Sequence, residues 1–261
     1  MRSLSIRSIK SLSRTSLHGH FGIAIPTVLL FDIIVAAAGS ISQIPGRSSA
    51  GTFTRSFWGV FLSVSGSLLI PLIIYLLISV FKTGLYGFFL KLARRLEAAP
   101  SDLFAPLQMH PDRIIIACIL VEGINILLIL PYLLVVTLAF GAVMRSSLTG
   151  SFSYQAAALL LLLFFTVIWV IAVVSINLNY VLIYYLFWDD TSLSGRELLA
   201  KSRRMMAGSR LHYLGLYLSF IGMSLLSVLS FGIGFIWVSP YIYESYAHFY
   251  LDVAEGSEKD L

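Results

Sequence analysis

Long apolar runs constrain this chain more than any other feature of its sequence. A membrane-spanning helix needs roughly 20 predominantly apolar residues to cross a hydrocarbon core of about 30 Å. Hydrophobic residues occupy 58% and charged residues only 12% of the 261 positions, whereas charged residues make up about 25% of an ordinary soluble domain. The sequence therefore excludes a soluble domain and predicts an all-α, polytopic bundle of membrane helices. The apolar runs cover residues 21–41, 57–81, 114–143, 156–188 and 211–250.

The last apolar run is too long for a single span. As one helix, residues 211–250 would measure about 60 Å at roughly 1.5 Å per residue, which is twice the thickness of the hydrocarbon core. Gly232 and Gly234 lie near the middle of this run, and glycine lets the backbone adopt the conformations that a tight turn requires. We therefore expect two spans, 211–229 and 233–250, which bring the total to about six.

The distribution of basic residues predicts the orientation of these spans. Apart from Arg47, Arg55 and Arg145, every lysine and arginine lies before the first span, after the second or fourth span, or beyond the last. Lysine and arginine collect on the cytoplasmic side of membrane proteins, so both termini are predicted to be cytoplasmic. The expected organisation is a basic cytoplasmic N-terminal segment (1–20), one transmembrane domain (21–251) and an acidic C-terminal tail (252–261).

Five polar side chains are predicted to lie at a common depth in the membrane. A charged side chain near the bilayer centre costs at least about 2.5–3.5 kcal/mol, so such residues usually face a bundle interior or water. One interpretation is a polar pocket or ion path, and the other is helix–helix hydrogen bonding with the carboxyl groups protonated. No lysine or arginine is expected at this depth. The five residues are Asp32, Glu122, Asn125, Asn177 and Asn179.

Residues 196–210 combine a basic face with an apolar face. Ser194 and Glu197 form a capping-box pattern, which predicts the start of a helix. With its apolar face toward the membrane, this helix would lie at the cytoplasmic surface and contact anionic lipid head groups. The alternative is an ordinary connection that follows the positive-inside rule. The N-terminal segment shows a weaker form of the same pattern. The candidate lipid contacts are Arg196, Lys201, Arg203, Arg204 and Arg210.

A glutamate and a histidine lie four residues apart near the C-terminus. Glu244 and His248 would share one face of a helix. Such a pair can move protons or hold a metal, but next to an aromatic belt a surface hydrogen bond is the favoured interpretation. The sequence contains no phosphate-binding glycine loop, zinc-binding His-Glu-x-x-His pattern or nucleophile elbow. We therefore expect no enzyme activity, no metal and no cofactor, and the membrane topology explains the positive charge without nucleic-acid binding.

The C-terminal third also carries a recognisable set of residues. They are Ser202 to Gly208, Leu218 to Gly222, Gly232 to Gly234, Trp237, Pro240, Tyr241, Phe249 and Tyr250, together with Leu92 to Arg94 and Asp102 to Phe104 in the second connection. This set resembles an uncharacterised bacterial membrane family, domain-of-unknown-function family 975, most clearly over residues 196–251. The resemblance implies a bacterial inner-membrane bundle of about six helices and implies no reaction.

The chain departs from the pattern of that family at two places. Met223 stands where the family usually has tryptophan. Residues 173–181 lack the Pro-Gly-Ile-Ile-Lys break that the family has late in the fourth span. We therefore expect a continuous apolar helix through this stretch.

These observations favour a non-enzymatic membrane protein that assists transport, export or envelope homeostasis. Its expected partners are the lipid bilayer, anionic lipid head groups, and either another membrane protein or a second copy of the chain. The rival hypothesis is a transporter or channel for ions or small solutes that uses the mid-membrane polar residues. A membrane-embedded lipid-modifying enzyme ranks last, because the sequence offers no nucleophile or metal cluster for it.

Overall fold

The computed structural model describes residues 4–42, 57–149 and 152–258, and every regular element within these ranges is a helix. This confirms the all-α prediction. In chain order the elements are α1 (Ile6–Leu17), α2 (Phe21–Ser42), α4 (Phe57–Ala93), η1 (Pro100–Leu103), η2 (Ala105–Leu107), α5 (Asp112–Thr149), α6 (Phe152–Asn177), η3 (Leu178–Tyr180), α7 (Ile183–Asp189), α8 (Gly195–Met205), α9 (Arg210–Leu218), α10 (Ile221–Leu229) and α11 (Phe235–Glu258).

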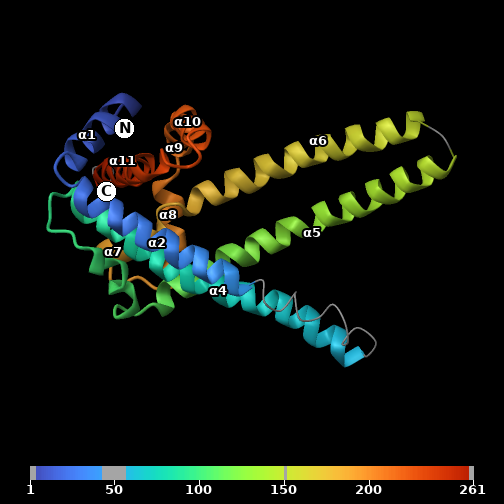
Figure 1. Cartoon of the computed structure of the whole chain (residues 1–261), viewed down its shortest axis with the longest axis horizontal. Helices are drawn as coiled ribbons and strands as arrows, with labels where there is room; N and C mark the ends of the chain where they lie inside the picture. Colours follow the sequence, from blue (N-terminus) through green and yellow to red (C-terminus); the bar gives the residue numbers. More distant parts are fainter. Residues whose placement is uncertain (1–3, 43–56, 150–151, 259–261) are drawn as a thin grey trace.

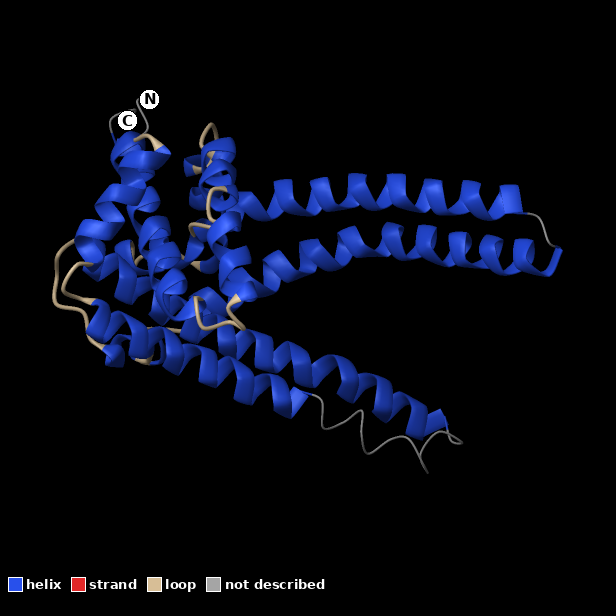
Figure 2. Cartoon of the chain, turned by 45° about the horizontal axis from the view of Figure 1, so that its top comes forward, coloured by secondary structure: helices blue, strands red, loops and turns tan. Residues whose placement is uncertain are grey.

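The molecule consists of a compact base and two projecting arms (Figures 1 and 2). Helices α5 and α6 run side by side and project away from the other elements, which they contact only at their near end, and we call this pair the long hairpin. Helices α2 and α4 form a shorter arm that diverges from it. We use the name "base" for α1, α7, α8, α9 and α11 together with the ends of α2 and α4 that pack against them.

Aromatic side chains fill the core of the base. Phe88 and Phe89, in the second half of α4, are both fully buried. Tyr185 of α7 stacks on Tyr250 of α11, with ring centroids 4.9 Å apart. Aromatic side chains bury more apolar area than any others, and stacked or edge-to-face pairs add a further ~0.5–1.5 kcal/mol each. The base therefore has a packed interior of its own, independent of any lipid.

Two glycines let α4 approach its neighbours closely. A side chain at Gly84 would collide with the backbone of Leu103 in η1, and one at Gly87 would collide with the indole ring of Trp188 in α7. The Trp188 indole nitrogen also donates a hydrogen bond of 2.8 Å to the Thr83 carbonyl oxygen. The absence of a Cβ atom thus allows the second half of α4 to become the central helix of the base.

The long hairpin, in contrast, leaves its apolar side chains exposed. Leu127 and Leu138 of α5 and Leu160 of α6 are each about two-thirds exposed. The contacts between the two helices include the ring of Tyr132, which stacks on that of Trp169 with centroids 4.5 Å apart, and a hydrogen bond of 3.1 Å from the Trp169 indole nitrogen to the Leu128 carbonyl oxygen. Contiguous apolar surface of this extent is not tolerated in water by a monomeric soluble protein, but it suits a helix whose backbone groups are internally satisfied in lipid.

Five helical stretches in the described residues are long and apolar enough to cross a membrane. They are Phe21–Ile41, Leu69–Ala93, Asp112–Ser146, Gln155–Asp189 and Arg210–Leu229. The return helix of the final hairpin, α11, is less apolar and is packed within the base, where it contacts α1, α2 and α4. The structure thus defines a helical membrane protein, and a count of about six spans is consistent with it.

The second span extends beyond the expected boundary at residue 81. Helix α4 continues to Ala93, so Lys82 and Lys91 lie within a helix and not in the connection where we expected them. Lys91 forms an ion pair of 2.6 Å with Asp102 of η1. The surroundings of Lys82 are described with the candidate site.

The fourth run is not the continuous helix that we expected. Helix α6 ends at Asn177, and residues 178–180 form the short 3₁₀ helix η3. The side-chain amide of Asn179 donates to the carbonyl oxygens of Ser175 and Ile176, at 2.8 and 3.0 Å. Such local side-chain hydrogen bonds compete with the regular helical pattern, which accounts for a break at this point without proline or glycine.

The final run folds back on itself as expected. The turn lies between Leu229 and Phe235, with Gly232 in the left-handed backbone region at φ +87°. The outgoing span is itself divided into α9 and α10 at Ser219, whose carbonyl oxygen accepts a hydrogen bond of 2.9 Å from Lys10 of α1. A basic side chain of the N-terminal helix thus satisfies a backbone group that the helix break leaves open.

The two ends of the described chain lie together in the base (Figure 1). The backbone nitrogen of Leu4 is 3.1 Å from both carboxylate oxygens of Asp252. Helix α11 continues to Glu258, so most of the acidic segment 252–261 is helical. Both ends of the described chain therefore lie at the same end of the molecule.

Candidate functional site

The structure brings together two of the five polar residues that we predicted at a common depth. Asn125 of α5 and Asn177 of α6 exchange hydrogen bonds across the long hairpin, at 2.9 and 3.4 Å. The Asn177 amide also donates to the carbonyl oxygen of Val173. Asn179 of η3 is buried, and its amide donates only to carbonyl oxygens in the last turn of the preceding helix, α6. This arrangement corresponds to hydrogen bonding between helices, the second of our two interpretations.

The two carboxylates do not join this pair. Asp32 lies on α2, in the other arm, and is exposed at the surface of the protein. Glu122 lies on α5, about one turn before Asn125, and is partly buried. Within the described ranges, neither carboxylate forms a hydrogen bond or an ion pair. The five residues therefore do not converge on a single pocket.

A cavity that the sequence did not reveal lies where the two arms meet the base. It has a volume of about 240 Å³ and is lined by residues from α4, α5, α6, η3, α7 and α9. Asn177, one of the expected site residues, forms part of its wall. The other lining residues with polar side chains are Lys82, Cys118, Tyr75, Tyr86, Tyr180, Tyr184 and Tyr213.

The lysine in this cavity was missed because the sequence places it next to the apparent end of an apolar run. In the structure, Lys82 is a partly buried residue inside α4. Its ammonium lies over the ring of Tyr184, 4.7 Å from the centroid, and 5.7 Å from that of Tyr86. Tyr86 and Tyr184 could not have revealed this site from the sequence, because only the tertiary structure brings their rings next to Lys82.

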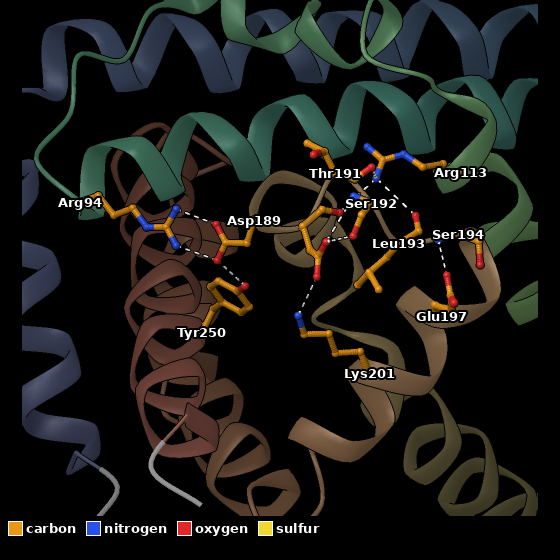
Figure 3. Close-up of polar contacts among 11 residues, drawn as sticks. Arg94, Arg113, Asp189, Thr191, Ser192, Leu193, Ser194, Glu197, Lys201 and Tyr250 are labelled. Carbon is orange, nitrogen blue, oxygen red and sulfur yellow. Dashed lines mark hydrogen bonds and ion pairs between the residues drawn. The ribbon is translucent and has the colours of Figure 1, made fainter. Parts of the chain in front are cut away.

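A polar network joins α4, α5, α7, α8 and α11 at the surface of the base (Figure 3). Arg94 binds both carboxylate oxygens of Asp189, at 2.6 and 2.7 Å, and Tyr250 donates to the same carboxylate at 2.6 Å. The hydrogen bond from Arg94 to Asp189 is the main reason why the pKa of this guanidinium is raised. Arg113 donates to backbone carbonyl oxygens of the connection between α7 and α8. The network fixes the position from which α8 begins.

The start of α8 has the capping box that the sequence predicts. Glu197 accepts a hydrogen bond of 2.8 Å from the backbone nitrogen of Ser194, and this bond lowers the pKa of the Glu197 carboxyl. Asp190 accepts hydrogen bonds from Ser192 and Lys201, which likewise lower the pKa of its carboxyl. Both carboxyls are therefore held in their charged form.

The apolar face of α8 is covered by the protein, contrary to our expectation of a helix with this face toward lipid. Leu198 and Met206 are fully buried in the core of the base. The hydroxyl of Ser202 donates to the carbonyl oxygen of Asn179, at 2.7 Å. The apolar face of α8 thus packs against the protein core, where we had expected it to contact the membrane surface.

The basic residues of this segment separate into two groups. Lys201 forms an ion pair of 3.1 Å with Asp190, and Arg210 is partly buried at the start of α9. Arg196, Arg203 and Arg204 are exposed, and in the described part of the chain no carboxylate forms an ion pair with them. These three arginines are the part of the predicted lipid surface that remains accessible.

The Glu244–His248 pair is not the surface feature that we expected. Glu244 is fully buried in α11, and the Nε2 atom of His248 lies 3.3 Å from its Oε1 atom. Neither carboxylate oxygen has a hydrogen-bond donor among the described residues. His248 also lines a larger cavity of about 870 Å³ between α1, α2, α4 and η1. The error arose because the aromatic residues around this pair form a protein core and not a membrane-interface belt.

The fold defines a helical membrane protein with a packed base and two arms that expose apolar side chains. Residues 2–257 match the family described as "Protein of unknown function (DUF975)", and the chain belongs to this family. The match covers nearly the whole chain and extends the resemblance seen in the C-terminal third. No curated protein and no solved structure matches the chain.

Proposed function

We propose that this protein is a non-enzymatic component of the bacterial cytoplasmic membrane that assists transport, export or envelope homeostasis through contact with anionic lipid of the inner leaflet. The observation that carries the proposal is the accessible side of α8. Its apolar face is anchored in the base, and Arg196, Arg203 and Arg204 face away from the protein without a carboxylate partner.

A basic side chain near an anionic membrane surface contributes about 1 kcal/mol to binding, and the effect falls off within a Debye length. Three arginines on a helix held in place by a buried face and a capping box present this charge without ordering a flexible segment first.

Contact between Leu4 and Asp252 supports an even number of spans, and the positive-inside rule supports a cytoplasmic position for both termini.

The lipid contact is tested with the full chain in nanodiscs that contain phosphatidylglycerol and phosphatidylcholine in equal amounts. Native mass spectrometry measures which lipid stays bound after the nanodisc is removed. The wild type is expected to retain phosphatidylglycerol preferentially, and each Arg→Gln substitution at the three positions reduces this preference about fivefold. Arg145→Gln, in the long hairpin far from α8, is the control and leaves the preference unchanged. Equal retention of the two lipids by the wild type would contradict the proposal.

The orientation and the class of function need two further measurements. Reporter fusions after Leu261 and at Ser147 should lie on opposite sides of the membrane, and finding both on one side would overturn the topology.

Reconstituted vesicles should show no flux of ions or small solutes above that of empty vesicles. Reproducible flux that Asp32→Asn or Glu122→Gln abolishes would replace this proposal with the transporter hypothesis.

A further inference from the structure

Lys82 differs from the other lysines in the described part of the chain. Lys10 donates to the carbonyl oxygen of Ser219, Lys91 pairs with Asp102, and Lys201 pairs with Asp190. Lys82 alone among these four has no oxygen acceptor, neither a carboxylate nor a carbonyl. Its charge is met only by the faces of two tyrosine rings.

The aromatic rings do not balance the cost of placing this charge inside a membrane protein. A cation–π contact contributes about 0.5–2 kcal/mol, whereas a lysine at the centre of a spanning helix costs about 2.5–3.5 kcal/mol. A lysine in a segment of this kind is therefore expected to have a counter-ion or water. The cavity in front of Lys82 provides the room for one.

We propose that the cavity around Lys82 binds an oxyanion, namely the phosphate group of a lipid or a phosphate ion. The ammonium supplies the charge, and Tyr75, Tyr86 and Tyr180, which line the same cavity, carry hydroxyls that can donate hydrogen bonds to the remaining oxygens. A volume of about 240 Å³ lies below the ~300–1,000 Å³ of pockets that enclose a drug-sized molecule. The cavity therefore accommodates a small head group and not a whole lipid.

The position of the cavity favours a lipid as the source of the phosphate. Its walls come from both arms, with Tyr75 from α4 and Asn177 from α6. On the same helices as the lining residues Tyr75 and Cys118, Ile73 of α4 and Ile126 of α5 expose most of their apolar surface. An acyl chain attached to a head group in the cavity would leave along these exposed apolar faces. This site is separate from the arginines of α8, so the inference goes beyond the proposed function and does not depend on it.

Glu122 is the competing partner for Lys82 within the chain. It lies on α5 one helical turn after Cys118, which lines the cavity. No ion pair joins Glu122 to Lys82 within the described residues. If this carboxylate were nevertheless the counter-ion, removing it would change the stability of the protein only when Lys82 is present.

The test uses the purified full chain in detergent, titrated with short-chain phosphatidic acid, inorganic phosphate or, as a control ligand, phosphatidylcholine of the same chain length. Binding is followed through tryptophan and tyrosine fluorescence and through the midpoint of thermal unfolding. Lys82→Met is expected to weaken phosphatidic acid binding at least tenfold, and Lys82→Arg should retain most of it. Lys10→Met is the matched control, because Lys10 also lies over an aromatic ring, that of Phe220 at 4.1 Å, but has a carbonyl acceptor.

A second measurement on the wild type guards against a variant that does not fold. Cys118 is the only cysteine of the chain and lines the cavity, so bound phosphatidic acid should slow its reaction with a small thiol reagent. Phosphate binding as tight as that of phosphatidic acid would identify the free ion as the ligand. The inference would be overturned if phosphatidylcholine bound equally well or if labelling of Cys118 were unchanged by phosphatidic acid. It would also be overturned if Lys82→Met and Glu122→Gln were coupled in their effects on stability while neither changed ligand binding. The variant lacking the three α8 arginines should still bind phosphatidic acid here, which separates this result from the test of the proposed function.

Discussion

The base and the long hairpin are built from similar apolar helices, yet they use their side chains in opposite ways. Phe89 in the base is fully buried, whereas Phe140 in the long hairpin is 63% exposed. In the base, aromatic rings pack against one another, whereas in the long hairpin many apolar side chains are exposed at the surface of the protein. Apolar composition alone therefore does not distinguish a protein core from a lipid-facing surface.

The two regions also differ in the polar contacts that hold them together. The base uses charged groups, as in the contact of Arg94 with Asp189. The long hairpin uses neutral side chains, with Asn125 bound to Asn177 and Tyr132 next to Thr166. Charged groups are costly in lipid, whereas amides and hydroxyls can satisfy one another across a helix pair at lower cost. The choice of polar residue thus follows the surroundings of each region.

The largest expected difference between the regions comes from removing a phenylalanine. Phe89→Ala should destabilise the protein by about 3–5 kcal/mol, because it leaves a cavity in the packed core of the base. Phe140→Ala should change stability by less than about 1 kcal/mol, because its site is exposed. The midpoint of unfolding of both variants in the same detergent measures this, and equal destabilisation would show that the long hairpin is packed against something in solution.

Substitutions at one glycine of the base and one of the long hairpin should differ in their effect on stability, though by less than the two phenylalanine substitutions. Gly84→Ala should lower the free energy of unfolding by about 1–3 kcal/mol. The added methyl group would collide with backbone atoms of Leu103, which cannot rotate aside as a side chain can. Gly141→Ala in α5 meets no atom and should be neutral or stabilising by up to about 1 kcal/mol. Thermal unfolding of the two variants compares them directly. A neutral Gly84→Ala would mean that α4 and η1 are farther apart than described.

Within the long hairpin, the asparagine pair should contribute less than either change in the base. A double-mutant cycle of Asn125→Ala and Asn177→Ala is expected to give a coupling energy of about 0.6 kcal/mol, and not more than about 1.7 kcal/mol. The measurement is reversible unfolding in mixed micelles, with Thr137→Ala on α5 as the control partner for Asn177. A coupling energy of zero would remove the interhelical hydrogen bond as a stabilising contact and reopen the pocket interpretation.

The smallest expected effect is a pH dependence confined to the start of α8. Hydrogen bonds lower the pKa of the Asp190 and Glu197 carboxyls in the folded protein. Their stabilisation is therefore fully present above the ordinary pKa of an unfolded carboxyl, about 4, and is lost as the pH falls through the lower folded value. Asp190→Asn should be less stable than the wild type at pH 7 and should approach it as the pH falls through the lowered pKa of this carboxyl. A constant difference across this range would show that the charge of Asp190 is not responsible.

Several features could be predicted from the sequence because they depend on neighbouring residues or on composition. The length of the apolar runs determines the membrane class, and Gly232 and Gly234 mark the turn of the final hairpin. Ser194 and Glu197 specify the capping-box pattern, since the hydrogen bond between them joins residues only three positions apart. Asn125 and Asn177 were identified as intramembrane polar residues, but their pairing was one of several possibilities.

Other features were decided only by the tertiary structure, because they depend on segments far apart in the chain. The amphipathic pattern of α8 is the same whether lipid or protein covers Leu198, and the packing of the base determines that protein does. Glu244 is buried because α1 and α4 enclose α11. Lys82 faces a cavity because α7, about 100 residues later, brings Tyr184 over its ammonium. Local sequence specifies helices and turns, whereas the surroundings of each side chain depend on which helices meet.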